Sequence, residues 1–354
     1  MLVPSPICGT KDNIPTVSGY QWIHKLKNKK IYFALFQRWP NDNLPCGFDF
    51  YIVSFHLEVI DTNWVKRQQQ LLSSVKIIVL ADGNSYNYSI PNVQFFPFYY
   101  WHYQLDQMQQ WWGVQPPKKK NWKFSAVCNR ISQSKIWSTT KLLETARESS
   151  LVVLNSWIEE KNVHNWEPTG REVLDNLTNI FRNKYLGQTI KIDDFENTND
   201  NWQSITSNPW QPMYDQTAIH FTNESFHYSG MSENKKEYVW PGPFITEKTL
   251  KCLLAGTAFI PVGQFETYST LRKLGLKFNY DFDISWDNDH GNLSRAQSIV
   301  ELIDTLNKFD VNQLISMTNE SNKYNQNHIV IGKFKNKCQL QNDKTIEEIN
   351  LTLQ

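Results

Sequence analysis

The sequence predicts an α/β protein built from two Rossmann-like domains. Short apolar runs of strand length recur along the chain and alternate with segments of helical spacing, the pattern of an α/β fold. The chain has 354 residues, enough to bury two separate cores. A stiff and charged segment, residues 116–120 (PPKKK), is the best linker candidate. We therefore expect an N-terminal domain over residues 1–118 and a C-terminal domain over residues 119–354.

The N-terminal half contains three apolar runs that read as buried strands. They lie at residues 31–36 (IYFALF), 48–55 (FDFYIVSF) and 75–80 (VKIIVL). Polar residues follow the last two runs directly, namely His56, Glu58 and Asp82. Because parallel strands end at a common edge, these three side chains are candidates for acid–base catalysis. The competing interpretations are a core histidine, a helix-start acid and an Asp-Gly turn.

An aromatic segment at residues 93–112 follows, and we interpret most of it as core that closes the first domain rather than as a sugar-acceptor cleft. In the second half, strands are expected at residues 124–128, 150–156, 218–222, 257–262 and 277–286. Helices are expected up to about residue 147 and at residues 171–185, 268–274, 296–309 and 346–353. The rest of the tail from residue 319 is polar.

The stretch from residue 244 to residue 263, FITEKTLKCLLAGTAFIPVG, predicts a helix that feeds a buried strand. Thr246 is a good N-cap, and Gly256 lies where a helix would stop. A lysine at the start of a helix gains no stabilisation from the helix dipole. The position of Lys248 therefore favours the interpretation that a phosphate group binds there. Glu247 is a second ligand candidate, although it is also a favourable first-turn acid.

Thr246, Glu247 and Lys248, with the helix and strand that follow, resemble the donor-binding motif of α1,3-fucosyltransferase-like glycosyltransferases. The same FITEKT run recurs in glycosyltransferase-like proteins of bacteriophages, to which the chain is also similar. Upstream, residues 221–225 (FTNES) look like the family's Phe-Glu-Asn-Ser segment with acid and amide exchanged.

That second match implies donor-binding roles for Asn223 and Glu224. Residues 124–143 are similar to the strand, Ser-Asn turn and helix that open the family's donor domain. The family places a donor-binding arginine about where Lys135 falls, so Arg130 and Lys135 are both candidates.

The resemblance implies a GT-B fold, in which the two Rossmann-like domains face an interdomain cleft and the last helix can cross back to the first domain. It implies transfer of fucose or a similar sugar from a nucleotide-diphosphate donor to a glycan or small acceptor, with inversion. The nucleotide sugar would be a co-substrate, and no cofactor is expected. The family uses a first-domain glutamate as base, which favours Glu58 over His56 and Asp82.

Asp281 and Asp283 form an Asp-x-Asp pair of the kind that holds Mn²⁺ in many glycosyltransferases. The pair follows the donor motif instead of ending an early strand of the donor domain. We therefore interpret it as a turn or strand pair and expect a metal-independent enzyme.

Net charge and composition narrow the range of possible partners, compartments and functions. The net charge is +1, which lacks the basic field that non-specific duplex binding requires, so a nucleic-acid partner is not favoured. The cysteines show no metal-site spacing and fit a reducing compartment; they are Cys8, Cys46, Cys128, Cys252 and Cys338. Without a bilayer-length apolar run or a signal layout, we expect a soluble, cytoplasmic protein of a bacterium or virus-infected cell. Two alternatives stay open: a phage DNA-base glycosyltransferase and a non-catalytic protein that binds nucleotide sugars or glycans.

Overall fold

The computed structural model describes residues 7–10, 20–26, 30–35, 43–54, 62–81, 90–99, 119–128, 131–155, 166–190, 212–223, 243 and 245–353. The chain divides into two compact units. Unit 1 comprises Met1–Gln104, Lys236–Pro243 and Lys335–Gln354, and unit 2 comprises Leu105–Lys235 and Phe244–Phe334. The expected boundary at residue 118 falls in the segment 100–118, which lies outside the described residues.

Unit 1 contains a five-stranded sheet in the order β1-β2-β3-β4-β5. Its strands are β1 (Ile7–Thr10), β2 (Ile31–Leu35), β3 (Phe50–Ser54), β4 (Lys76–Ala81) and β5 (Val93–Pro97). β1 runs antiparallel to β2, and the other pairs are parallel. The three strands expected in this half are confirmed, because their β-rich apolar runs are long enough for a strand and too short for a helix.

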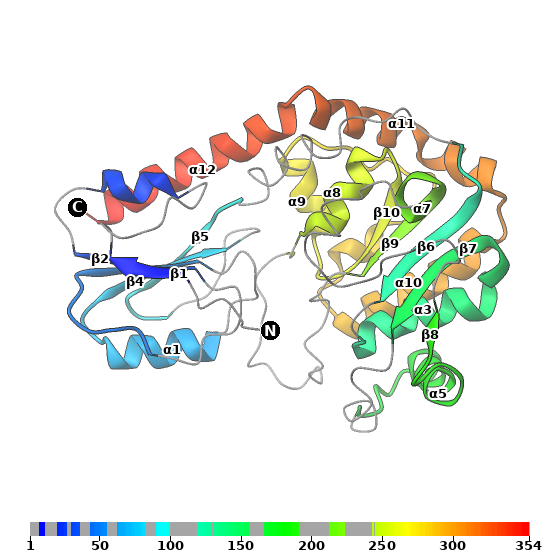
Figure 1. Cartoon of the computed structure of the whole chain (residues 1–354), viewed down its shortest axis with the longest axis horizontal. Coiled ribbons are helices and arrows are strands. Elements are labelled where there is room, and N and C mark those ends of the chain that lie inside the picture. The colour runs from blue at the N-terminus through cyan, green and yellow to red at the C-terminus, as the bar shows by residue number, and fades with distance from the viewer. Residues whose placement is uncertain are drawn as a thin grey trace. The chain divides into compact units, whose positions relative to one another are not determined.

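Alternate residues of these strands point to two separate cores. Tyr51 and Val53 pack with Trp64 and Val65 of α1 (Thr62–Leu71) on one face of the sheet. Ile52 on the other face belongs to a cluster with Tyr20, next to the short 3-10 helix η2 (Gln21–Lys25), and with the end of the C-terminal helix α12 (Lys333–Thr352). Figure 1 shows α1 and α12 on opposite sides of this sheet.

Unit 1 includes the last twenty residues of the chain, because α12 is bonded to the end of β5. The Asn342 side chain accepts a hydrogen bond from the Tyr99 backbone N–H at 2.7 Å and donates one to the Tyr99 carbonyl at 3.1 Å. Thr345 donates to the Pro97 carbonyl at 2.7 Å. Asn342 is fully buried, so it satisfies two backbone groups that would otherwise lose water without compensation.

Unit 2 contains a second five-stranded sheet, in the order β10-β9-β6-β7-β8. Its strands are β6 (Trp122–Cys128), β7 (Ser150–Asn155), β8 (Thr189–Ile190), β9 (Thr217–Asn223) and β10 (Ala258–Val262). All neighbours are parallel except β7 and β8. Both units are therefore α/β with mainly parallel sheets, as the sequence predicted.

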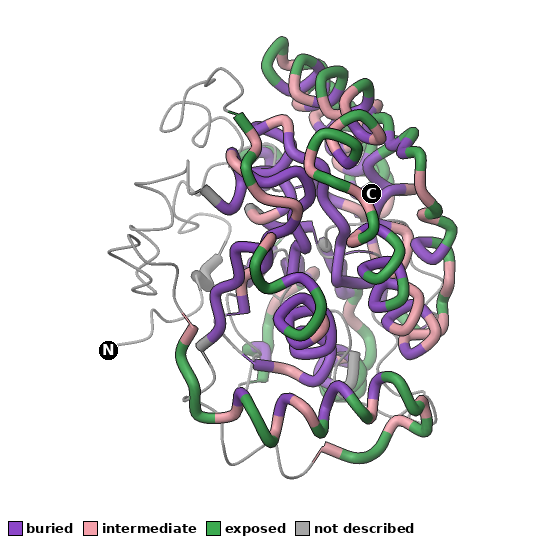
Figure 2. The backbone as a smooth tube through the Cα atoms, turned by 90° about the vertical axis from the view of Figure 1, so that its right-hand side faces the viewer, coloured by how far each residue is buried: buried purple, intermediate pink, exposed green. Residues whose placement is uncertain are grey.

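Helices cover both faces of this sheet. The helices of unit 2 are α3 (Gln133–Thr145), α5 (Glu172–Lys184), α7 (Pro212–Asp215), α8 (Glu247–Leu254), α9 (Thr267–Lys273), α10 (Asn292–Asn307) and α11 (Val311–Val330), with 3-10 turns η3 (Arg147–Ser149) and η4 (Ser285–Asn288). Figure 1 shows α3 and α10 on one side of the strands and α8 and α11 on the other. β9 and β10 are buried at every residue, whereas the short edge strand β8 is exposed or half-buried, and the helices alternate buried and exposed residues (Figure 2).

The strand expected at residues 277–286 is wrong. The segment is irregular up to η4, and its backbone pairs with side chains of α11 instead of with a neighbouring strand. Asn325 accepts from the Lys277 N–H at 2.7 Å and donates to the Lys277 carbonyl at 2.6 Å. Ser321 accepts from the Asn279 N–H at 2.8 Å. These buried polar side chains satisfy the backbone groups that a sheet would have satisfied.

The same side chains explain why the sequence analysis missed α11. The helix begins with a capping box, in which Asp310 and Gln313 cap one another's backbone, and it buries Thr318, Ser321 and Asn325. Four of its six buried residues are polar, so the apolar periodicity of a helix is interrupted between Leu314 and Ile329. Among the described residues, no helix is long and apolar enough to cross a lipid bilayer.

Candidate functional site

Three neighbouring parallel strands of unit 2, β6, β9 and β10, end at the same edge of the sheet. Val262 at the end of β10 pairs with Asn223 at the end of β9. The helices α3, α8 and α9 follow these strands in turn. Open parallel sheets bind ligands at the carboxyl ends of their strands, so this edge is the candidate site.

The helix α8 begins where the sequence predicted, because Thr246 caps it. The Thr246 backbone is extended, and its hydroxyl accepts a hydrogen bond from the Lys248 N–H at 3.3 Å. The Lys248 ammonium lies 3.4 Å from the same hydroxyl, which keeps its charge at the start of the helix. A helix start carries a partial positive charge, so this lysine adds to it instead of offsetting it.

Lys135 occupies a matching position on α3. It is the third residue of that helix, which has no acidic residue in its first turn, and only 8% of its surface is exposed. Two helix starts that follow adjacent strands, β6 and β9, thus each carry a lysine. Each of these helix starts therefore carries a lysine that does not stabilise its own helix, a feature that is typical of an anion site.

Asn223, the third candidate, is buried between α3 and β6. Its amide donates to the Val127 carbonyl at 3.0 Å and to the Thr139 hydroxyl at 3.4 Å, and its carbonyl accepts from the Ser138 hydroxyl at 3.2 Å. Thr139 in turn donates to the carbonyl of Lys135 at 2.8 Å. Asn223 therefore joins the end of β9 to the first turns of α3 and orients the segment that carries Lys135.

The positive potential of α8 reaches the interior of the sheet. His220, in the middle of β9, shares a hydrogen bond with the Ser125 hydroxyl at 2.8 Å and lies 4.6 Å from the ring of Tyr214. Burial, together with the charges of Lys251 and Lys248, lowers the pKa of His220 to about 3. The imidazole is thus neutral at physiological pH, and it serves as part of the polar core between α8 and the sheet.

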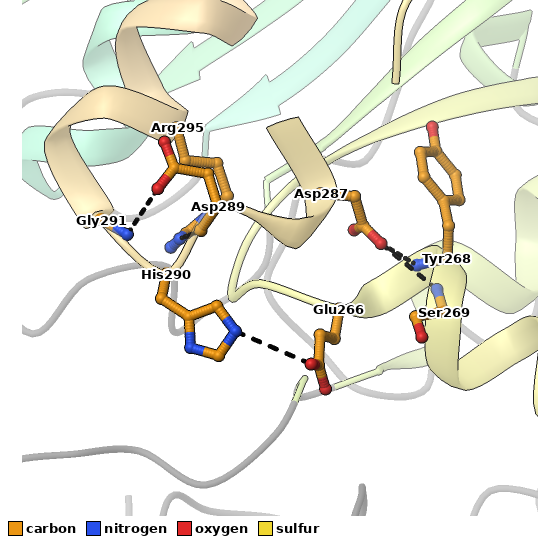
Figure 3. A network of polar contacts seen from close by, with 8 residues as sticks. All are labelled: Glu266, Tyr268, Ser269, Asp287, Asp289, His290, Gly291 and Arg295. Carbon is orange, nitrogen blue, oxygen red and sulfur yellow. Dashed lines mark hydrogen bonds and ion pairs between the residues drawn. The ribbon is translucent and has the colours of Figure 1, made fainter. Parts of the chain in front are cut away.

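The loop after β10 holds residues that the sequence analysis did not single out (Figure 3). Glu266 adopts a left-handed backbone with φ of 61°, unusual for a residue with a side chain. Its N–H donates to the Asp287 carbonyl at 2.6 Å. The carboxylate of Asp287 accepts from the N–H groups of Tyr268 and Ser269 at 2.9 and 3.2 Å, and it therefore caps α9 from a distant part of the chain.

Asp287 is a buried acid whose environment opposes ionisation. Burial raises its pKa to about 6, although its hydrogen bonds with backbone N–H groups act in the opposite direction. Its second oxygen, Oδ1, is buried and accepts no hydrogen bond from any residue that the structure describes. Desolvation of the carboxylate therefore outweighs the capping bonds.

Arg295 of α10 is fully buried and binds two loops at once. Its Nε donates to the Gly263 carbonyl at 3.2 Å and its Nη1 to the Asp289 carbonyl at 2.6 Å. Nη2 donates to Asn292 Oδ1 at 2.9 Å. Burial lowers the pKa of Arg295 to about 10, still high enough to keep the guanidinium charged at neutral pH. The loop after β10 and the loop before α10 are thus fixed to each other by one cation.

These two loops present three side chains near the edge of the sheet. The rings of Phe265 and His290 stack with centroids 4.1 Å apart, and the Arg295 guanidinium lies 5.9 Å from the centroid of the Phe265 ring. His290 Nε2 lies 3.7 Å from Glu266 Oε1, and the His290 side chain is 67% exposed. Figure 3 shows the imidazole and the Glu266 carboxylate pointing toward each other from separate loops.

Several expected site residues lie outside the described part of the chain. These are the three acid–base candidates His56, Glu58 and Asp82 and the donor candidates Arg130 and Glu224. Glu247 begins α8, and only its backbone is described. The candidate site therefore rests on Thr246, Lys248, Lys135 and Asn223 together with the loops that carry Glu266 and His290.

The Asp-x-Asp pair lies in the irregular segment before η4. Asp281 and Asp283 are exposed, and Asp283 accepts hydrogen bonds from the Ser285 N–H at 2.8 Å and from its hydroxyl at 3.0 Å. Asp283 thus closes a local turn. Within the described ranges, no three His, Cys, Asp or Glu side chains come together in a way that could hold a metal ion.

No local sequence pattern points to the loop-binding role of Arg295 or to the capping role of Asp287, because Arg295 reaches Gly263, and Asp287 reaches Tyr268 and Ser269, across 18 to 32 residues of chain. Glu266 and His290 likewise lack a local pattern. Comparisons of the chain with protein-family models, with curated protein sequences and with solved structures found no match.

Proposed function

We propose that the protein is a glycosyltransferase that moves a sugar from a nucleotide-diphosphate donor to a glycan or small acceptor. The observation that carries the proposal is the pair of lysines, Lys135 and Lys248, in the first turns of the two helices that follow strands β6 and β9. Each lysine is unfavourable for its helix alone and becomes favourable beside a diphosphate. Units 1 and 2 would be the two domains of a GT-B enzyme.

The chemistry that such a site supports is displacement at the anomeric carbon. The acceptor hydroxyl oxygen forms a bond to that carbon while the bond from the carbon to the diphosphate oxygen breaks. Negative charge grows on the leaving diphosphate, and Lys135, Lys248 and the two helix starts stabilise it. The acceptor proton passes to a base, which we expect among His56, Glu58 and Asp82. Inversion without a metal ion is the course that we propose.

The test is a thermal-shift screen of nucleoside diphosphates and their sugar conjugates. A ligand that binds only the folded protein raises its melting temperature, with a stabilisation of about 2.7 kcal/mol at a concentration of about 100 Kd. We expect at least one nucleoside diphosphate to stabilise the wild-type protein. Release of that diphosphate from its sugar conjugate, on addition of an acceptor, would then measure transfer.

Lys248→Ala should weaken binding of that diphosphate by about ten- to a hundredfold, because a charge-assisted hydrogen bond contributes roughly 1.5–3 kcal/mol. Its unliganded melting temperature should change little, since the side chain is half-buried and lies at the unfavourable end of the dipole. Lys323→Ala is the matched control, because Lys323 is an exposed lysine in the middle of α11. Equal affinities in the wild-type protein and both variants would contradict the site, and no response to any diphosphate would contradict the function.

A further inference from the structure

The exposed His290 and the half-buried Glu266 are held in place by buried charge. A non-glycine residue in the left-handed region costs roughly 1–2 kcal/mol, and Glu266 keeps that conformation through the bond from its N–H to Asp287. Arg295 binds carbonyls on both loops, one at Gly263 and one at Asp289. The fold thus uses a buried cation and a buried acid to orient two side chains that contribute little to the core. Backbone strain and buried charges that support side chains at the surface are typical of a preorganised binding site.

The ring stack gives this spot a flat surface. The Phe265 ring stacks on the His290 imidazole and covers one of its faces, and the Arg295 guanidinium lies 5.9 Å from the centroid of the Phe265 ring. The His290 side chain is 67% exposed, which leaves its other face open to a ligand. A carboxylate, that of Glu266, stands 3.7 Å from the edge of the same ring.

We propose that Glu266 and His290 form a subsite for a neutral sugar ring that carries vicinal hydroxyls. The apolar face of the sugar packs on the open face of the imidazole, and two neighbouring hydroxyls donate hydrogen bonds to the Glu266 carboxylate. A carboxylate accepts two donors at once, and charge-assisted bonds of this kind are about twice as strong as neutral ones. This inference deepens the proposed function and rests on it for the origin of the sugar.

The position in the fold fits such a role. Glu266 lies four residues after Val262, which pairs with Asn223 at the end of β9. The subsite therefore belongs to the same sheet edge as the helix starts that carry Lys135 and Lys248. The sugar could come from the nucleotide-sugar donor or from a glycan acceptor, since both present the same hydroxyl chemistry.

Saturation-transfer NMR with free sugars tests the subsite without requiring a nucleotide. The probes are fucose, glucose, galactose, mannose and N-acetylglucosamine at millimolar concentration, with wild-type protein, Glu266→Gln and His290→Ala. The control is Glu301→Gln, because Glu301 is an exposed acid on α10. Thermal melts of each variant verify that it is folded.

We expect saturation transfer to the ring protons of at least one sugar in the wild-type protein and in the control. Glu266→Gln and His290→Ala should each weaken the binding of that sugar about tenfold, which is the loss of affinity expected from one charge-assisted bond or one stacking contact. Absence of transfer to every sugar in the wild-type protein, or equal transfer in all four proteins, would overturn the subsite. A folded variant is needed for this comparison, and His290→Gln replaces His290→Ala if the latter does not fold.

A second arm identifies the source of the sugar. Saturating nucleotide sugar should displace the free sugar if the subsite holds the donor, whereas the signal should persist if it holds the acceptor. Either result supports the subsite. Failure of every nucleoside diphosphate to bind would overturn the proposed function, whatever the free sugars do, so the two failures are distinguishable.

Discussion

Replacement of Asp287 by asparagine should change the way in which stability depends on pH. The Asp287 carboxylate accepts two backbone hydrogen bonds at the start of α9, and such bonds favour the charged form. Burial favours the neutral form and prevails, so the folded protein raises the pKa of Asp287 from 3.8 to about 6. The folded protein therefore binds a proton more tightly than the unfolded chain does.

The sign and size of the expected change in unfolding free energy follow from the linkage between proton binding and folding. Between pH 3.8 and about 6 the folded state holds more protons at this site than the unfolded state, so the free energy of unfolding falls as pH rises through that window. Each unit of pKa difference corresponds to about 1.4 kcal/mol, which puts the whole loss at roughly 3 kcal/mol. Below this pH window the protonated Asp287 contributes its full stabilisation of the folded state, and above the window that stabilisation is lost. Asparagine does not titrate and should show no such loss.

Urea denaturation at pH 3.5, 5, 6 and 7 measures the difference directly. The unfolding free energy of Asp287→Asn, minus that of the wild-type protein, should rise by roughly 3 kcal/mol across the series. Asp283→Asn is the control, because Asp283 is exposed and closes only a local turn. A constant difference would refute the argument that burial outweighs the capping bonds. A difference that falls as pH rises would mean that the capping bonds outweigh burial, because folding would then stabilise the ionised carboxylate.

Three further substitutions test other parts of the structure. Glu266→Gly should raise the melting temperature, since glycine tolerates a φ of 61° and relieves roughly 1 kcal/mol; an unchanged or lower value would contradict strain at this residue. Asn223→Ala should lower the unfolding free energy by roughly 1–3 kcal/mol, measured in urea, because the Val127 carbonyl and its other buried partners lose their bonds. Asn342→Ala should cost roughly 2–4 kcal/mol by leaving both backbone groups of Tyr99 unpaired, and wild-type stability in this variant would show that the two bonds to Tyr99 do not contribute to stability.

Local patterns predicted most of the regular elements. The runs at residues 31–36 and 75–80 contain enough β-branched and aromatic residues to form strands in any buried context, and β2 and β4 occupy them. Thr246 caps α8 as expected, because capping involves a side chain and a backbone group two residues apart. Lys248 could be placed beside that helix start for the same reason.

Contacts between residues distant in the sequence decided the elements that local patterns did not predict. Residues 277–286 alternate in a way that suits a strand, yet Asn325 and Ser321 of α11 bind that backbone instead. Buried polar positions also concealed α11, since Thr318, Ser321 and Asn325 look like surface residues when they are read in order. The choice between a sheet partner and a helix partner depends on which groups meet in space, and periodicity carries no information about it.

The sequence by itself determined that the chain is α/β, where its main strands lie, and that lysine and a cap stand at the start of α8. Only the tertiary structure decided that Asn223 bonds to α3 and β6, and that Asp287 and Arg295 orient Glu266 and His290. The physical reason is the range of the interactions. A cap or an apolar stripe is formed by residues close in sequence, whereas the energy of a buried charge depends on backbone groups that only the folded chain brings to it.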